Sequence, residues 1–256
     1  MGVNFINSEI CEIDGEGMIY FSDPRQLRDK IIETVSRVEA KKFFSSTDEN
    51  IKKVRESMAE YFLTSALKKD SHQDWFLMQP QKDPPDFVLM TASDNPTTIT
   101  LDEFELVEIP GRCQTFNEMM SIVQEKIERR YSVSYNLLIF VNNERSKEWI
   151  SLLHRHLEDY HSFKTIWTVH LLRYKDKKDL FGYVVNRLRP YPVRHIEGVL
   201  GESYLSQPIP IFMEEIKRGD KTFLSFKSDF VNSLTKELRK IILSRAQKKG
   251  KERGSL

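Results

Sequence analysis

"PPDFVLM" (residues 84–90) and "FELVEI" (residues 104–109) are two short apolar segments that carry carboxylates. The acids are Asp86, Glu105 and Glu108. Residues 87–90 are apolar at every position, which is typical of a strand covered on both faces, as in the centre of a sheet. Carboxylates are seldom buried without a partner. The two segments therefore raise the question whether these acids are surface groups or the walls of one acidic site.

The composition is that of an ordinary globular protein. The chain has 256 residues, of which 39% are hydrophobic and 30% are charged. Its 39 Lys and Arg against 38 Asp and Glu leave a net charge of +1, so any basic surface must come from local segregation of charge. No apolar run reaches the roughly 20 residues that span a bilayer, and the first residues have no signal-peptide pattern. We expect a cytoplasmic protein with no membrane partner, whose oligomeric state the sequence leaves open.

Hydrophobic periodicity and turn residues divide the chain into helices and strands. The expected elements are a hairpin at 10–21, a helix at 23–44, a helix at 48–69 capped by Thr47 or Asp48, strands at 74–80, 84–90 and 99–109, a helix at 114–131, a strand at 135–143, a helix at 146–160, a strand at 164–173 and a helix at 228–247. The alternation in 180–192 is too weak to assign. The order predicts an α/β fold with a mixed central sheet flanked by helices.

Acids on two neighbouring strands suit a divalent metal ion. Magnesium binds one or two carboxylates together with waters and substrate phosphate, and it then polarises the phosphate and activates a water. A nearby lysine adds positive charge to the transition state. The chain has no P-loop, no dinucleotide-binding glycine fingerprint and no "GxSxG" elbow, which excludes the commonest nucleotide-binding and acyl-transfer sites.

With these segments the chain resembles the PD-(D/E)xK nuclease superfamily, whose fold is that of the restriction endonucleases. Pro85 and Asp86 match the first motif, and Glu105 matches the second acid. Glu60, on the preceding helix, is the candidate for the helical acid that often accompanies them. The resemblance covers about residues 48–143. We expect a single domain over 1–256, with a nuclease-like core at about 48–143, an α/β extension at about 144–247 and a disordered basic tail at 248–256.

The motif lysine is missing from its usual position. Two residues after Glu105 stands Val107, and two residues after Glu108 stands Pro110. We favour Glu105 as the second acid, because "FELVEI" resembles a variant, "EVTEI", whose lysine position holds Thr. The strand period of two then puts Glu108 on the opposite face, near a neighbouring helix.

Some members of the superfamily carry the lysine on the following helix. Lys126 is the main candidate here, and Gln124 a weaker one. The apolar stripe of that helix uses Val123 and Ile127, so Lys126 lies at its edge and must extend toward the strand ends.

The resemblance implies a divergent metal-dependent endonuclease that hydrolyses phosphodiester bonds in DNA or RNA. Its catalytic residues would be Glu60, Asp86, Glu105 and Lys126, with Mg²⁺ or Mn²⁺ bound by Asp86 and Glu105. Whether catalysis survives is left open by the missing motif lysine. One alternative is a catalytically inactive nuclease-fold protein that binds nucleic acid or serves as an assembly subunit. Another is an unrelated α/β interaction protein whose acids are surface groups.

The C-terminal segment is the most basic part of the chain. Between Lys236 and Arg253 it carries eight Lys and Arg against only Glu237 and Glu252. Such a run can contact a phosphate backbone without reading sequence. It is also typical of a solvated helix end with a basic tail, which suits the helix dipole.

Overall fold

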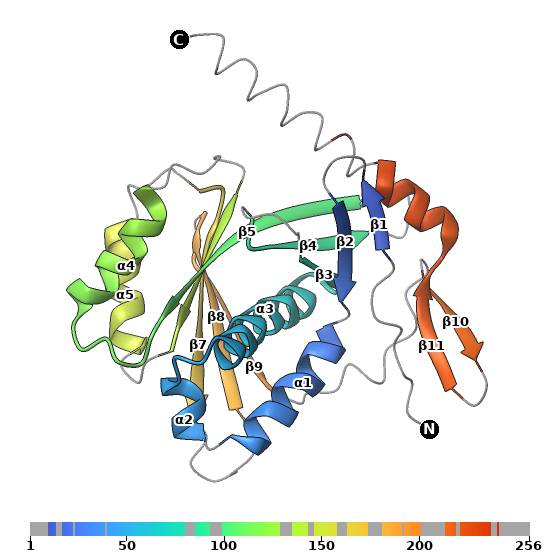
Figure 1. The fold of residues 1–256 in the computed structure, drawn as a ribbon. Helices are drawn as coiled ribbons and strands as arrows, with labels where there is room; N and C mark the ends of the chain where they lie inside the picture. Colours follow the sequence, from blue (N-terminus) through green and yellow to red (C-terminus); the bar gives the residue numbers. More distant parts are fainter. Residues whose placement is uncertain are drawn as a thin grey trace.

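A computed structural model describes residues 10–13, 17–22, 24–38, 40–79, 85–92, 99–128, 135–142, 146–157, 163–173, 181–190, 192–200, 213–218, 221–236 and 240. The basic tail at 248–256 lies outside these residues, and so does the second half of the expected C-terminal helix. The described chain is an α/β protein with helices packed against a mixed, curled sheet (Figure 1). Among the described residues, no helix is long and apolar enough to cross a membrane.

Seven strands form the body of the sheet, side by side in chain order from β3 to β9. A hairpin of β1 and β2 pairs with β3 and extends this edge, so that the whole order is β1 to β9. Their bounds are β1 Ile10–Ile13, β2 Gly17–Ser22, β3 Trp75–Gln79, β4 Phe87–Ala92, β5 Ile99–Ile109, β6 Asn136–Val141, β7 Ile166–Arg173, β8 Phe181–Arg189 and β9 Arg194–Val199. Neighbours are antiparallel except β5–β6 and β6–β7, which are parallel. A separate hairpin joins β10 (Met213–Arg218) to β11 (Lys221–Phe226).

The helices divide between the two faces of the sheet. They are α1 (Pro24–Arg37), α2 (Ala40–Ser45), α3 (Glu49–Ser71), α4 (Phe116–Glu128) and α5 (Ser146–Leu157). Residues of α1, α2 and α3 share one buried core with Phe104 of β5, whereas α4 and α5 share the other with Val107 and Ile109. Helices α4 and α5 are the crossovers that parallel pairing requires. Strand β5 therefore sends successive side chains into two different cores.

The predicted order of elements from 48 to 143 is confirmed as α3, β3, β4, β5, α4 and β6. Asp48 is the N-cap of α3, and all six residues of β4 are buried. The expected single helix at 23–44 is wrong, because α1 ends at Arg37 and a second helix, α2, begins at Ala40. The break lets α2 take its own direction, with Phe43 and Phe44 buried in the core. The unassigned segment 180–192 contains the whole of β8.

A buried ion pair fixes α3 and α2 to β5. Arg55 Nε lies 2.6 Å from Glu108 Oε1, and the two side chains are only 6% and 9% exposed. Arg55 Nη2 donates to Glu108 Oε2 at 3.2 Å, and Nη1 donates to the carbonyls of Phe43 and Ser46 at 2.8 and 2.9 Å. Asn142 adds a hydrogen bond to Glu108 Oε1 at 3.1 Å. The expectation that Glu108 faces a neighbouring helix is confirmed, and that helix is α3.

Replacing Arg55 by Ala should destabilise the fold strongly. The change leaves the carboxylate of Glu108 buried without its cation, so we expect the free energy of unfolding to fall by about 3–5 kcal/mol. Chemical denaturation followed by circular dichroism measures this loss. The matched control is Arg37→Ala, which breaks a pair with Glu33 whose side chains are 73% and 57% exposed. That control should cost less than about 1 kcal/mol, and an equal cost for both variants would contradict the role of Arg55.

Candidate active site

Asp86 lies at the very start of β4, where local sequence places it. Pro85 has no backbone N–H to give to a neighbouring strand, so Asp86 is the first residue here that donates to β5, from its N–H to the carbonyl of Phe104 at 3.0 Å. Phe87 pairs with Phe104, and their rings stack with centroids 4.9 Å apart. Continuing this antiparallel register by one residue sets Asp86 opposite Glu105.

Glu105 is the most enclosed of the acids in the sheet. It lies on β5 with no exposed surface at all. Because side chains alternate along a strand, Glu105 shares with Val107 and Ile109 the face that α4 and α5 cover. A carboxylate in such a place is costly unless a cation accompanies it. Glu105 is therefore not a surface group.

Helix α4 supplies the cation. Thr115 and Glu118 form a capping box at its start, since the Glu118 N–H donates to Thr115 Oγ1 and the Thr115 N–H donates to Glu118 Oε2. One face of the helix is buried through Val123 and Ile127, and Lys126 lies at the edge of that face in the last turn. Its side chain is 13% exposed and runs inward along the helix to the sheet.

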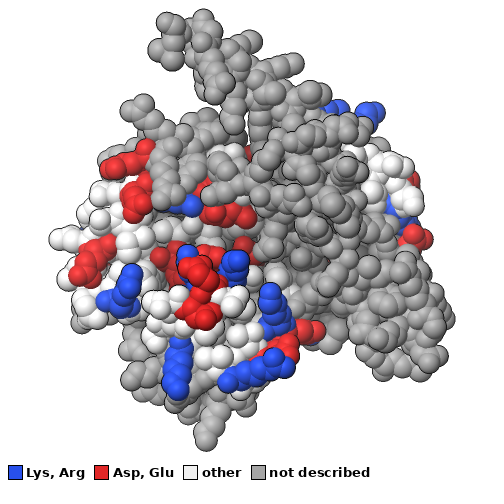
Figure 2. Space-filling model, in the orientation of Figure 1, with Lys and Arg blue, Asp and Glu red and all other residues white. Residues whose placement is uncertain are grey.

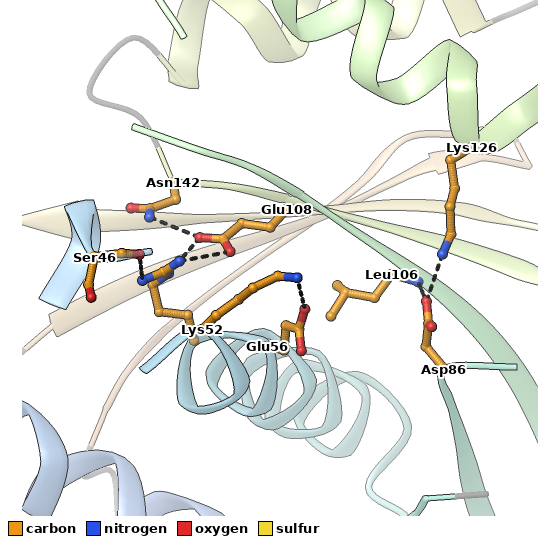
Figure 3. Close-up of polar contacts among 9 residues, drawn as sticks. Ser46, Lys52, Glu56, Asp86, Leu106, Glu108, Lys126 and Asn142 are labelled. Carbon is orange, nitrogen blue, oxygen red and sulfur yellow. Dashed lines mark hydrogen bonds and ion pairs between the residues drawn. The ribbon is translucent and has the colours of Figure 1, made fainter. Parts of the chain in front are cut away.

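The ammonium of Lys126 joins the two acids. Its Nζ lies 3.0 Å from Asp86 Oδ2 and 2.8 Å from Glu105 Oε2. Asp86 Oδ2 also accepts the backbone N–H of Leu106 at 2.6 Å (Figure 3). The structure thus brings together three of the four residues singled out in the sequence, on β4, β5 and α4, as the resemblance led us to expect.

The pKa of Lys126 reflects this position. Burial by itself lowers the pKa of a lysine, but here the hydrogen bond to Glu105 and the charge of Asp86 outweigh burial and raise the pKa above its usual value. Lys126 is therefore a cation at every physiological pH. Two carboxylate oxygens that contact one ammonium can lie no farther apart than the sum of their distances to it, so Asp86 Oδ2 and Glu105 Oε2 are close neighbours.

The sequence missed a further acid, Glu56, which approaches from α3. Burial raises the pKa of Glu56, the positive charge of Lys52 lowers it, and the negative charges of Glu108 and Asp86 raise it again. Figure 3 shows Lys52 and Glu56 side by side on α3, beneath Leu106 and between Glu108 and Asp86, with Lys52 Nζ 3.9 Å from Glu56 Oε1.

Glu60, the helical acid expected from the sequence, lies one turn farther along α3 and is 4% exposed. Its part in the site stays a prediction. Glu56 and Glu60 are four residues apart and so project from the same side of the helix. In the sequence these two acids differ only in their distance from the start of the helix. That distance does not tell which turn of α3 lies nearer to Asp86.

Figure 2 shows acidic side chains gathered near the middle of the face that it draws, with Lys and Arg side chains spread around them. The described surface on this face therefore carries charge of both signs.

The donor set suits a hard cation such as Mg²⁺ or Mn²⁺. Asp86 and Glu105 bring one oxygen each to a single position, and Mg²⁺ completes its shell with waters and phosphate oxygens. Within the part of the chain that the structure describes, no group of three or more His, Cys, Asp and Glu side chains could hold a metal ion. Among the described residues, the two carboxylates are thus too few for a closed structural zinc site, which needs four protein ligands.

No protein-family model matches the chain, and the searches of curated proteins and of solved structures give no match either.

The pH dependence of stability tests the surroundings of Glu56. Because its pKa is raised in the folded protein, Glu56 stabilises the fold below its unfolded pKa of about 4.3, and this contribution is lost as the pH rises through the higher folded value. Glu56→Gln should therefore raise the free energy of unfolding at pH 7, by less than about 1 kcal/mol for this partly exposed group. The difference from wild type should vanish below about pH 4.

Denaturation at several pH values measures this difference. Glu33→Gln is the control, since Glu33 pairs with Arg37 on the exposed side of α1 and should give no gain at pH 7. A Glu56→Gln variant that is less stable than wild type at pH 7 would show that its neighbours do not repel it.

Proposed function

We propose that this protein is a divergent metal-dependent nuclease of the PD-(D/E)xK type that hydrolyses phosphodiester bonds in DNA or RNA. The observation that carries the proposal is the position of Lys126. The usual lysine position is occupied by Val107, yet Lys126 brings an ammonium from α4 to within 3.0 and 2.8 Å of the same two acids. A side chain with this reach supplies the missing part of the motif.

The arrangement of strands supports the finer assignment of a restriction-endonuclease-like core. In the proposed core, α3 precedes an antiparallel run of β3, β4 and β5, and α4 then leads to β6, which is parallel to β5. Asp86 comes directly before β4 and Glu105 lies on β5, so the acids belong to two adjacent strands, as the resemblance implies.

The proposed chemistry gives each side chain a separate task. Asp86 and Glu105 would hold Mg²⁺ or Mn²⁺, and such an ion would supply Lewis-acid polarisation of a phosphate and a lowered pKa for bound water. Lys126 opposes the negative charge that develops on the phosphate in the transition state. The helical acid of the motif would be Glu60 on α3, as the sequence predicts.

A second function has its own supporting observation. Glu105 has no exposed surface and Lys126 covers it, which also suits a nuclease-fold subunit that binds nucleic acid or assembles with other proteins without cleaving. This alternative predicts nucleic-acid binding that needs no divalent metal.

A cleavage assay with Mg²⁺ or Mn²⁺ on single- and double-stranded DNA and RNA separates the two functions. We expect metal-dependent cleavage by the wild type. Asp86→Asn, Glu105→Gln and Lys126→Met should each lower the rate at least about a hundredfold, because each removes a charge that acts on the reacting phosphate or its metal.

The matched control is Lys164→Met. Lys164 Nζ lies 2.7 Å from Oδ1 of Asp102, which is on β5 like Glu105. The side chain of Lys164 is 55% exposed, and within the described part of the chain its ion pair is with Asp102 and not with Asp86 or Glu105. This variant should cleave like the wild type. Absence of cleavage on every substrate, with binding retained in EDTA, would favour the inactive subunit instead.

A further inference from the structure

We propose that Asp86 and Glu105 form one cation position for which the ammonium of Lys126 and the divalent metal compete, so that metal binding releases Lys126 toward the substrate. This inference rests on the proposed function and adds to it the order in which the site is assembled.

The first observation is that Lys126 contacts the same carboxylate oxygens that a metal ion would need as ligands. Its Nζ contacts Oδ2 of Asp86 and Oε2 of Glu105, one oxygen from each acid. Asp86 Oδ2 has a second donor in the N–H of Leu106. A metal ion bound to both acids through these oxygens would occupy the position that the ammonium of Lys126 occupies.

The second observation concerns access. The side chain of Glu105 is 0% exposed, that of Lys126 is 13% exposed and that of Asp86 is 29% exposed. Asp86 is thus the acid that solvent reaches, and Lys126 lies beside it and over Glu105. An ion that enters from Asp86 reaches Glu105 only as Lys126 moves aside.

The charges of the two cations and the flexibility of the Lys126 side chain mean that one cation replaces the other at this position. A monovalent and a divalent cation at one position repel each other strongly, because like charges side by side cost several kcal/mol. The backbone of Lys126 is fixed by its buried neighbours Val123 and Ile127, whereas its four-carbon side chain can swing. The displaced ammonium therefore remains within a side-chain length of the metal, which is where a metal-bound phosphate needs positive charge.

Calorimetric titration with Mg²⁺, and with Mn²⁺ in parallel, tests the competition on the 256-residue chain. Lys126→Met keeps the length of the side chain and removes its charge, so we expect this variant to bind the metal at least about tenfold more tightly than the wild type. Lys164→Met, which removes an exposed cation from the neighbourhood of the same strand, should bind the metal like the wild type.

A second measurement needs no variant. Acylation of lysines with acetic anhydride, read by peptide mass spectrometry, should modify Lys126 several times faster when Mg²⁺ is present, because the released amine becomes exposed. Lys164 should react equally with and without Mg²⁺, since it is exposed in both cases. This arm keeps the inference testable even when Lys126→Met does not fold.

The outcomes separate this inference from the proposed function. Tighter metal binding by Lys126→Met together with lost cleavage supports both. Cleavage by the wild type with equal or weaker metal binding by Lys126→Met, or with unchanged acylation of Lys126, overturns the competition and leaves the nuclease intact. Tighter binding by Lys126→Met without cleavage by any variant supports the competition and overturns the nuclease. Absence of metal binding by both proteins overturns the two together.

Discussion

The ion triad of Asp86, Lys126 and Glu105 is the interaction on which the account depends. Glu105 sits on a central strand with no contact with solvent, and the desolvation of such a charge costs several kcal/mol unless a cation is near. That requirement dictates where α4 must end, because the ammonium has to arrive from the last turn of this helix. The capping box at the start of α4 fixes that end of the helix and so helps to hold Lys126 in place.

Strand β5 also carries the ion pairs that link the sheet to helices on both of its faces. It carries an acid on each face, and each acid is matched by a cation from a different helix: Glu105 by Lys126 of α4, and Glu108 by Arg55 of α3. The two pairs differ in kind. Arg55 binds Glu108 through two nitrogens and also secures α2, which is a geometry that a planar guanidinium fixes rigidly. Lys126 holds its acids by a single flexible ammonium, which is suited to a site whose contents change.

Much of this arrangement could be read from the sequence, and the rest could not, for physical reasons. The apolar runs beside Asp86 and Glu105 identify the central strands, because burial on both faces leaves a strong pattern. Lys126 was reached through the resemblance, because Val107 occupies the lysine position and some members of the superfamily carry the lysine on the following helix. The position of Glu56 between Glu108 and Asp86 was not accessible, since the place where α3 crosses the sheet is set by contacts that are distant in sequence. The separation of α1 from α2 was missed for a similar reason, because the α2 carbonyls are bonded by Arg55 and Asn142, which are distant in sequence.

The most direct test of the central claim is a crystal structure of the protein soaked with Mn²⁺, in which anomalous scattering locates the ion. The account predicts an anomalous peak between the carboxylates of Asp86 and Glu105, with the ammonium of Lys126 moved out of contact with at least one of them. Lys126 still bridging both acids in crystals where Mn²⁺ is bound elsewhere, or not bound at all, would contradict it.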